Sequence, residues 1–268
     1  MTTMATAKPG TVRYEAREGV AHLTIDNEAR RNAMSLAMWQ SLPELAARAD
    51  ADPSVRAIVL AGAGDQAFCA GADISQFGEA RSSEAAVAAY DEAVARGGNA
   101  LVGASKPSIA LIRGICFGGG LGLAMACDIR LAAGGSRFRI PAARLGLGYG
   151  YEGVRTLVGR IGYPATADLL VSARIVESDE AERLGIVNRV WPADRFSEEA
   201  SAYLAQVGRN APLTLKATKG ALAALSRPEA GRDLEAVAAL VAACFGSHDY
   251  REGQAAFREK RDPVFRGE

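Results

Sequence analysis

The sequence predicts an α/β fold, because short apolar stretches rich in β-branched residues alternate with stretches of helical character. Of its 268 residues, 49% are hydrophobic and 23% are charged, which is typical of a globular protein that can bury a substantial core. Strand-like patterns end near residue 191, and only helical patterns follow. We therefore expect an α/β core followed by a helical region.

Six stretches are predicted to be strands. The first, 20–26, alternates and places Ala21, Leu23 and Ile25 on one face. The others are apolar runs or short β-rich segments, at 55–62, 107–114, 128–133, 137–141 and 186–191.

Helices are predicted between and after these strands. Ser35 is expected to cap the first, and Pro43 inside it should kink or shorten that helix. The other predicted helices are 83–97, 120–127, 154–171, 178–184, 195–209, 212–226 and 230–246. The segment 233–245 is apolar nearly all round, so it should pack on its own core or on another subunit. The residues after 246 are interpreted as a polar end.

Composition and charge exclude several functional classes. The formal net charge is zero and no basic stripe is present, which argues against a nucleic-acid partner. The four cysteines form no CxxC pair and no short cluster with histidine, so we expect free thiols and no metal. No apolar run approaches the ~20 residues of a membrane span, and the first residues do not resemble a signal peptide. A cytoplasmic protein without a membrane partner is expected.

Two glycine-containing stretches share one design. Residues 67–77 (AFCAGADISQF) and 116–126 (CFGGGLGLAMA) each place small residues where a strand turns into a helix. The first N–H groups of a helix lack intrahelical partners and carry the positive end of its dipole. Two such groups aimed at one point form an oxyanion hole, worth about 3–4 kcal/mol to a transition state that builds charge on a carbonyl oxygen. Each stretch alone is equally well explained as a tight packing turn. The 116–126 stretch does not fit a P-loop or a dinucleotide fingerprint.

Four motifs resemble one known family. AFCAGADI, KPSIALIRGICFGGGLGLAMACDIRLAA, SARIVESDEAERLGIVNRV and EGQAAFREKRDPVF are similar to motifs of the crotonase superfamily, the enoyl-CoA hydratase/isomerase family. The resemblance extends from about residue 12 to 266 and implies a spiral of ββα units with a C-terminal helical trimerisation region. It divides the chain into a core, 11–195, and a helical oligomerisation region, 196–268. It also implies a homotrimer or hexamer, coenzyme A as part of a thioester substrate, no separate cofactor and no metal.

The resemblance also assigns site residues. The amides of Ala72 and Gly119 correspond to the family's oxyanion hole, which holds the thioester oxygen as an enolate develops. The residues that correspond to coenzyme A contacts are Arg30, Arg31, Ala70, Asp73, Ile74, Phe257 and Lys260. The two arginines are equally well explained as a solvated loop pair, and Asp73 as the cap of a following helix.

The resemblance implies that both catalytic glutamates of the hydratases are missing. Gly122 and Ala142 stand at their positions. In the family, the glutamate pair activates water and supplies a proton, and each such group contributes about 10²–10⁴-fold. The candidates that remain are Tyr149, which matches a tyrosine of methylmalonyl-CoA-type decarboxylases, and Glu152 as a relocated acid or base. Tyr149 is equally explained as pocket-wall packing, and Glu152 as a charge that complements a helix N-terminus.

Two classes of function follow. The first is a lyase-like enzyme of fatty-acid metabolism that stabilises an acyl-CoA enolate. Three reactions remain as alternatives for this enzyme. They are hydration through Glu152, double-bond isomerisation, and decarboxylation or other C–C cleavage with Tyr149. The second is a non-catalytic acyl-CoA-binding homologue. An RNA-binding homologue is disfavoured by the zero net charge.

Overall fold

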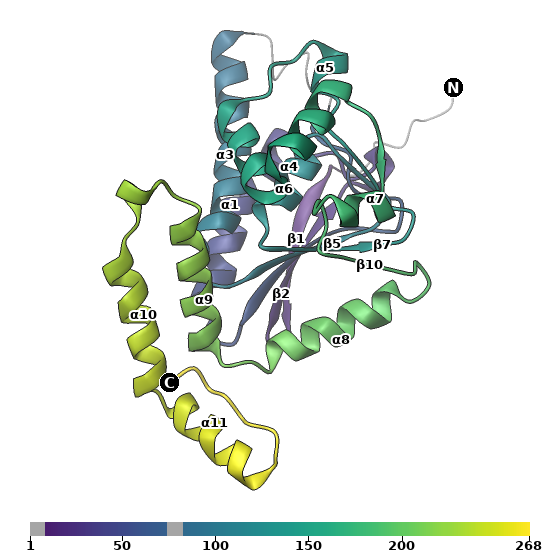
Figure 1. The fold of residues 1–268 in the computed structure, drawn as a ribbon. Coiled ribbons are helices and arrows are strands. Elements are labelled where there is room, and N and C mark those ends of the chain that lie inside the picture. Colours follow the sequence, from purple (N-terminus) through teal and green to yellow (C-terminus); the bar gives the residue numbers. More distant parts are fainter. Residues whose placement is uncertain (1–8, 74–82) are drawn as a thin grey trace.

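The described strands form two sheets, and strands that follow one another in the chain often belong to different sheets. The computed structural model describes residues 9–73 and 83–268. The larger sheet has the order β1-β2-β3-β5-β7-β10 (Figure 1). Its strands are Thr11–Arg17, Val20–Asp26, Ala57–Gly62, Ser108–Ile112, Ile129–Ala133 and Arg189–Trp191. The β1–β2 pair is antiparallel, and the other pairs are parallel.

The smaller sheet has the order β4-β6-β8-β9. Its strands are Ala67–Cys69, Ile115–Phe117, Arg137–Arg139 and Val176–Glu177. The chain visits the larger sheet, then the smaller sheet, and then enters a helix, as in β5, β6 and the helix α4 (Gly119–Ala126). This repetition confirms the predicted α/β fold of ββα units. Gly114 joins β5 to β6 with a positive φ of 62°, and a Cβ there would lie 2.0 Å from the carbonyl oxygen of Gln66.

The first helices pack together on the core. Helix α1 (Leu36–Ala51) and helix α3 (Glu84–Gly103) are neighbours. Ser35 caps α1 as predicted, accepting a hydrogen bond from the Met38 amide at 3.3 Å. The predicted shortening at Pro43 is wrong, because α1 continues to Ala51. Its buried stripe, which includes Trp39 and Leu42, provides tertiary packing that offsets the hydrogen bond lost at proline.

The middle of the chain supplies four helices. They are α4, α5 (Ala142–Leu145), α6 (Tyr151–Ser172) and α7 (Ser178–Arg183). Helix α6 is interrupted at Gly162, where φ is 74°. Figure 1 shows α4, α5 and α6 gathered at one end of the molecule.

The last residues form helices along one side. Helix α8 (Phe196–Gly208) packs Phe196 and Leu204 on the face of the larger sheet opposite the main core. Helices α9 (Pro212–Leu225), α10 (Leu234–Gly246) and α11 (His248–Glu259) follow, and α11 projects beyond the sheet (Figure 1). Since α8 packs on the sheet, the part that projects begins after it. The domain division at residue 196 stays a prediction.

Several elements were not predicted from the sequence. The stretch interpreted as a polar end contains α11, whose cap Ser247 accepts a hydrogen bond from the Tyr250 amide at 3.0 Å. Its side chains are mostly polar, so the low apolar content suggested a solvated tail and not a helix. Strand β1 is largely exposed, and β4 and β6 have three residues each, which is too short for an alternation to show. Within the described residues, no helix is long and apolar enough to cross a membrane.

Candidate functional site

The two glycine-containing stretches meet at the end of the smaller sheet. Strands β4 and β6 are parallel neighbours that pair Cys69 with Cys116, so the segments that follow them leave side by side. A Cβ on Gly71 would lie 3.5 Å from the Gly119 amide nitrogen. A Cβ on Gly119 would lie 4.0 Å from the Ala72 amide nitrogen. The structure thus brings together the two amides that the sequence singled out.

Among the described residues, no acceptor is found for the N–H of Ala72 or of Gly119, so both groups can donate to a ligand. The flanking groups, in contrast, are engaged, since the Met34 amide donates to Gly71 at 2.8 Å and the Asp73 amide donates to Met34 at 2.9 Å. Gly119 is also the first residue of α4, where the helix dipole adds positive potential. The arrangement can hold one negatively charged oxygen.

Close packing next to the two amides explains why residue 120 is a glycine. A Cβ on Gly120 would lie 2.3 Å from the Cys69 carbonyl oxygen, a distance that real Cβ atoms do not show. Gly120 therefore lets α4 pack directly on the end of β4. The ring of Trp39 lies on the other side, 3.3 Å from where a Cβ on Gly119 would be, and its Nε1 donates to the Tyr90 hydroxyl at 3.1 Å. Sequence reasoning missed Trp39 and Tyr90, because their positions look like ordinary core positions of two helices.

Tyr149 reaches the same face of α4. Its hydroxyl oxygen lies 3.7 Å from where a Cβ on Gly122 would be, so it stands over the position at which the resemblance places a family glutamate. Gly122 is three residues after Gly119, and residues at this spacing share a helix face. Burial raises the pKa of Tyr149 above its usual value of 10.0. The phenol is therefore neutral, and can donate a hydrogen bond, at ordinary pH.

Glu152 is not brought to this point. Its side chain is 72% exposed and forms an ion pair with Arg155 at 2.7 Å within the first turn of α6. This contact fits the alternative interpretation, a charge near a helix N-terminus. Ala142, at the position that the resemblance assigns to the second family glutamate, begins α5.

The loop that contains the two predicted arginines lies against the Ala72 segment. Arg30 donates to both carboxylate oxygens of Asp73, at 2.8 and 3.1 Å. The Ala70 amide donates to the Arg31 carbonyl at 3.0 Å, and the Arg31 side chain is exposed. The proposed capping role of Asp73 and the contact assigned to Ile74 concern residues 74–82, which lie outside the described residues.

Asn32 anchors this loop, and sequence reasoning missed it. Its side chain is 1% exposed and donates to the carbonyls of Ala63 and Ala67 at 2.9 and 2.7 Å. It also accepts from the Asn27 amide at 3.0 Å. The only available signal was an asparagine in a loop, where it can adopt the positive φ of 57° seen here. A polar loop suggested solvent exposure and not burial.

Asp128, the carboxylate at the end of the glycine-rich stretch, has a structural position. Both of its oxygens accept from the Lys219 ammonium group at 2.8 Å, and the two side chains are 13% and 3% exposed. It also accepts from the amide and hydroxyl of Ser108. This network ties α9 to the C-terminal end of α4.

Three of the four cysteines, Cys69, Cys116 and Cys127, lie in the core, whereas Cys244 is half-buried. Burial raises the pKa values of Cys69 and Cys127 to about 12 and that of Cys116 well above its usual value. These thiols are neutral and inaccessible at ordinary pH. In the described part of the chain, no group of three or more His, Cys, Asp or Glu side chains is arranged to hold a metal.

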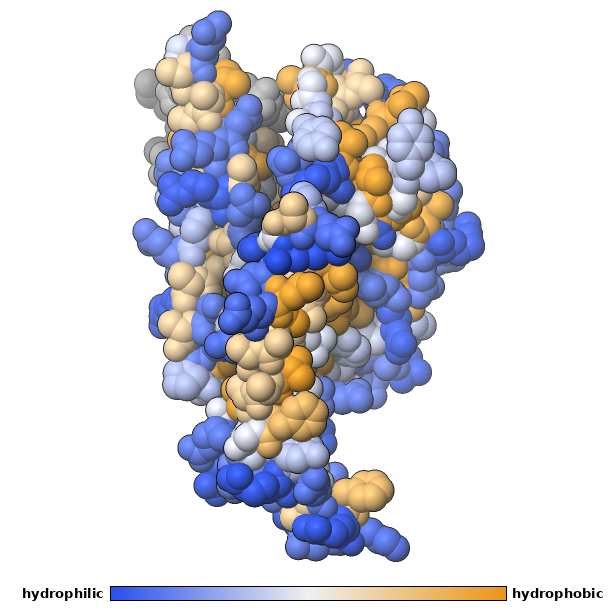
Figure 2. Space-filling model, turned by 60° about the vertical axis from the view of Figure 1, so that its left-hand side comes forward, coloured by the Kyte–Doolittle hydropathy of each residue, from blue (hydrophilic) through white to orange (hydrophobic). Residues whose placement is uncertain are grey.

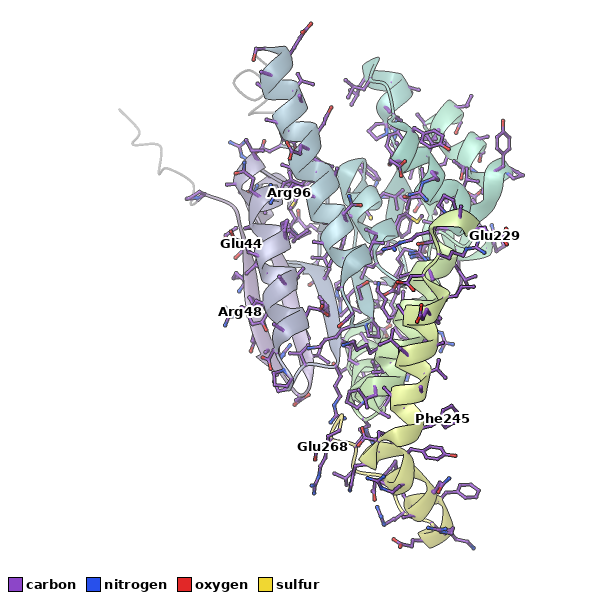
Figure 3. The ribbon with its side chains drawn as sticks, turned by 90° about the vertical axis from the view of Figure 1, so that its left-hand side faces the viewer. Glu44, Arg48, Arg96, Glu229, Phe245 and Glu268 are labelled. Carbon is purple, nitrogen blue, oxygen red and sulfur yellow. The ribbon has the colours of Figure 1, made fainter. Side chains whose placement is uncertain are left out.

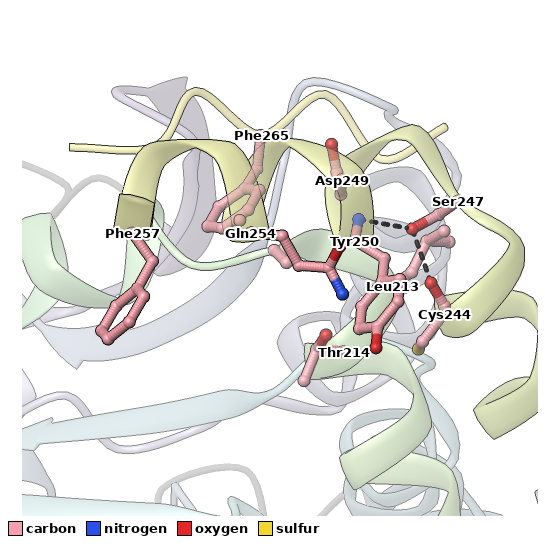
Figure 4. A pocket seen from close by; sticks show the side chains of 11 residues that line it. Leu213, Thr214, Cys244, Ser247, Asp249, Tyr250, Gln254, Phe257 and Phe265 are labelled. Atoms are coloured by element: carbon pink, nitrogen blue, oxygen red, sulfur yellow. Dashed lines mark hydrogen bonds between the residues drawn. The ribbon is translucent and has the colours of Figure 1, made fainter. Parts of the chain in front are cut away.

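Phe257 lies in the last turn of α11, and Lys260 is the residue that ends this helix. Figure 1 shows α11 at the opposite end of the molecule from α5 and α6. Phe257 is 88% exposed and borders a pocket of about 450 Å³ between α9, the end of α10 and α11 (Figure 4). Tyr250, Gln254 and Phe265 line the same pocket. It includes none of the residues around the two free amides, so we do not identify it with the site described above.

Comparisons with known proteins identify the family. Residues 15–268 match the family model described as enoyl-CoA hydratase/isomerase. A crotonyl-CoA hydratase from Syntrophomonas wolfei is 31% identical over 252 residues, which cover 94% of this chain and 96% of that protein. A short-chain-enoyl-CoA hydratase from Clostridium acetobutylicum is 31% identical over 247 residues, covering 91% and 94%.

Solved structures agree with this result. The crystal structure of an enoyl-CoA hydratase/carnithine racemase from Magnetospirillum magneticum is similar with a TM-score of 0.90 and 33% identity, and the match covers 97% of each chain. An enzyme that acts on acyl-CoA is consistent with all of these relatives. The chain belongs to the enoyl-CoA hydratase/isomerase family.

Proposed function

We propose that this protein binds an acyl-CoA thioester and stabilises its enolate with the amides of Ala72 and Gly119. The observation that carries the proposal is that these two N–H groups are neighbours without acceptors among the described residues, and that one of them begins a helix. As negative charge develops on the thioester oxygen, both amides donate to it. Donors fixed before the reaction need no reorganisation and stabilise the transition state more than the substrate.

Tyr149 is the best-supported group for the chemistry next to that oxygen. Its hydroxyl stands on the Gly119 face of α4, and Glu152 points to solvent. This placement favours decarboxylation of a malonyl-type thioester over hydration. In that reaction the bond between the α-carbon and the carboxylate breaks, its electron pair forms the enolate, and CO₂ leaves. The α-carbon then takes a proton. The neutral Tyr149 hydroxyl orients the carboxylate, or supplies that proton and regains one from water.

Hydration by a relocated Glu152 has weaker support, because a carboxylate paired with Arg155 on the outer face of α6 would have to turn inwards. Double-bond isomerisation needs a base at the α-carbon, and none of the described carboxylates lies against Gly122. A non-catalytic acyl-CoA-binding protein would use the same two amides without Tyr149.

One set of assays separates these functions. Loss of enoyl-thioester absorbance with crotonyl-CoA tests hydration, with the Glu152→Gln variant alongside. Release of CO₂ from malonyl-type thioesters tests decarboxylation, with Tyr149→Phe alongside. We expect CO₂ release that Tyr149→Phe lowers by about 10²-fold or more. Hydration abolished by Glu152→Gln would overturn the assignment of Tyr149, and thioester binding without any turnover would identify a binding protein.

We also propose that the protein assembles as a trimer or a dimer of trimers through α10 and α11. Leu234, Val241 and Phe245 on α10 are 67%, 43% and 63% exposed. Figure 2 shows hydrophobic surface along this side of the molecule, and Figure 3 shows Phe245 directed away from the sheet. An exposed apolar patch of this kind marks an interface. Phe257 and Lys260 would then lie beside a neighbouring subunit's coenzyme A.

Sedimentation of the purified protein tests this assembly. We expect a mass of three or six chains, and we expect Phe245→Glu to shift it towards the monomer. A monomeric wild-type protein at high concentration would contradict the proposal.

A further inference from the structure

Helix α6 contains a glycine whose backbone does not require it. Gly153 is the third residue of the helix and is not among the residues with positive φ. A glycine inside a helix is less favourable than alanine, because it loses more conformational freedom on folding. The reason for this glycine must therefore be the space that a side chain would occupy.

That space is filled by the ring of Tyr149. A Cβ on Gly153 would lie 2.7 Å from Cε1, 3.2 Å from Cζ and 3.4 Å from Cδ1 of that ring. The first distance is shorter than real Cβ contacts. The ring cannot yield as the end of a flexible chain does, because it is rigid and packed against the hydrophobic core. A side chain at residue 153 would therefore displace the Tyr149 ring from its observed position.

Gly122 lies beside the hydroxyl end of the same tyrosine side chain. A Cβ at position 122 would meet the hydroxyl at 3.7 Å, an ordinary contact, and nothing else within 4 Å, so a methyl group fits there. The described residues provide no hydrogen-bond partner for this hydroxyl. The two glycines therefore have different effects: Gly153 admits the ring, and Gly122 leaves open the side of α4 that the hydroxyl faces.

We propose that Gly153 is a positioning residue, which places the Tyr149 hydroxyl over Gly122 beside the two free amides. This inference rests on the proposed function and deepens it. A Cβ at position 122 would lie 3.7 Å from this hydroxyl, so Tyr149 stands beside the position at which the resemblance places a glutamate.

The chain provides a matched control for Gly153→Ala. Gly159 lies in the same helix, and a Cβ there would meet nothing within 4 Å. Gly153→Ala and Gly159→Ala therefore make the same chemical change in the same helix. Only the first is expected to displace Tyr149.

The first readout is independent of any reaction. In protein labelled with 3-fluorotyrosine, the ¹⁹F resonance of Tyr149 is identified by its loss in Tyr149→Phe. We expect Gly153→Ala to shift this resonance and Gly159→Ala to leave it in place. An unshifted resonance in Gly153→Ala would overturn the positioning role, whatever the protein catalyses. A shifted resonance without turnover of any thioester would leave the positioning role intact and sink the proposed function.

The second readout is turnover of a malonyl-type thioester. We expect Gly153→Ala to lower kcat by about 10²-fold, since a misplacement near 1 Å has an effect of this size, and to change KM little. In a Tyr149→Ala background, Gly153→Ala should lower kcat no further, because no ring is left to displace. Equal losses in both backgrounds would show that Gly153 acts independently of Tyr149 and would overturn the proposal.

Discussion

Helices α4 and α10 have similar apolar sequences and opposite surroundings. Six of the eight residues of α4 are buried. None of the thirteen residues of α10 is buried, although the helix is apolar on nearly every side. Composition alone predicts that both helices need to be buried against other residues. It does not predict that α4 is buried within its own chain, whereas we propose that α10 is buried against another chain.

Helix α9 lies between these two environments. On one side it packs against α10, and on the other its Lys219 reaches Asp128, next to the end of α4. The ion pair is almost fully buried, so its charges depend on each other. The region proposed for assembly is therefore tied to the helix whose first amide faces the site.

The largest expected effect comes from breaking this connection. Lys219→Met leaves the Asp128 carboxylate buried without its ammonium partner, and removing one member of a buried pair destabilises proteins by about 3–5 kcal/mol. We expect a loss of this size in the free energy of unfolding, measured by urea denaturation. The double variant Lys219→Met/Asp128→Asn should recover most of it, because no charge is left buried and the amide oxygen can still accept from Ser108. A single variant as stable as the wild type would show that the pair contributes nothing.

The same substitution in each helix sharpens the comparison. Leu121 on α4 is fully buried, whereas Leu234 on α10 is 67% exposed. Leu121→Ala should lower the free energy of unfolding by about 2–5 kcal/mol, because it removes apolar contacts and leaves a cavity. Leu234→Ala should change it by less than about 0.5 kcal/mol in the monomer, as for other surface positions.

Protein concentration separates the two effects. If an interface covers α10, the loss in Leu234→Ala should grow at concentrations where the wild type is assembled. The loss in Leu121→Ala should not depend on concentration. Equal losses in dilute monomeric protein would mean that α10 is covered within its own chain.

Alkaline pH should weaken the α4 region through its buried thiols. Cys69 and Cys127 have pKa values raised by burial from 9.0 to about 12. Between these values the unfolded chain loses the thiol protons and the folded chain keeps them, so the unfolded state binds fewer protons and stability falls as pH rises. The expected slope is about 1.4 kcal/mol per pH unit for each thiol.

Denaturation at several pH values between 9 and 12 measures this slope. The Cys127→Ala variant should show a smaller slope, even though the substitution also removes packing at every pH. A slope that Cys127→Ala leaves unchanged would contradict the assignment to the thiols.

The sequence predicted the regular elements better than the details of the site. Strands such as 20–26 and 107–114 were found because burial imposes an apolar pattern, and the motifs located Ala72 and Gly119. Asn32 and Trp39 were missed, because their contacts join residues far apart in the sequence and need no local pattern. The mutual placement of Tyr149, Gly122 and Gly153 depends on two helices meeting, which only the three-dimensional structure specifies.

The smallest expected effect distinguishes two glycines within α4. A Cβ on Gly122 makes only an ordinary contact of 3.7 Å, so Gly122→Ala should gain helix propensity and stabilise the protein by up to about 1 kcal/mol. Gly120→Ala should destabilise it instead, because its Cβ would lie 2.3 Å from a backbone oxygen. Thermal unfolding of both variants gives the two signs. A loss of stability in Gly122→Ala would mean that the helix needs glycine at this position for packing. Gly122 would then be part of the tight contact beneath the amides and not open space beside the Tyr149 hydroxyl.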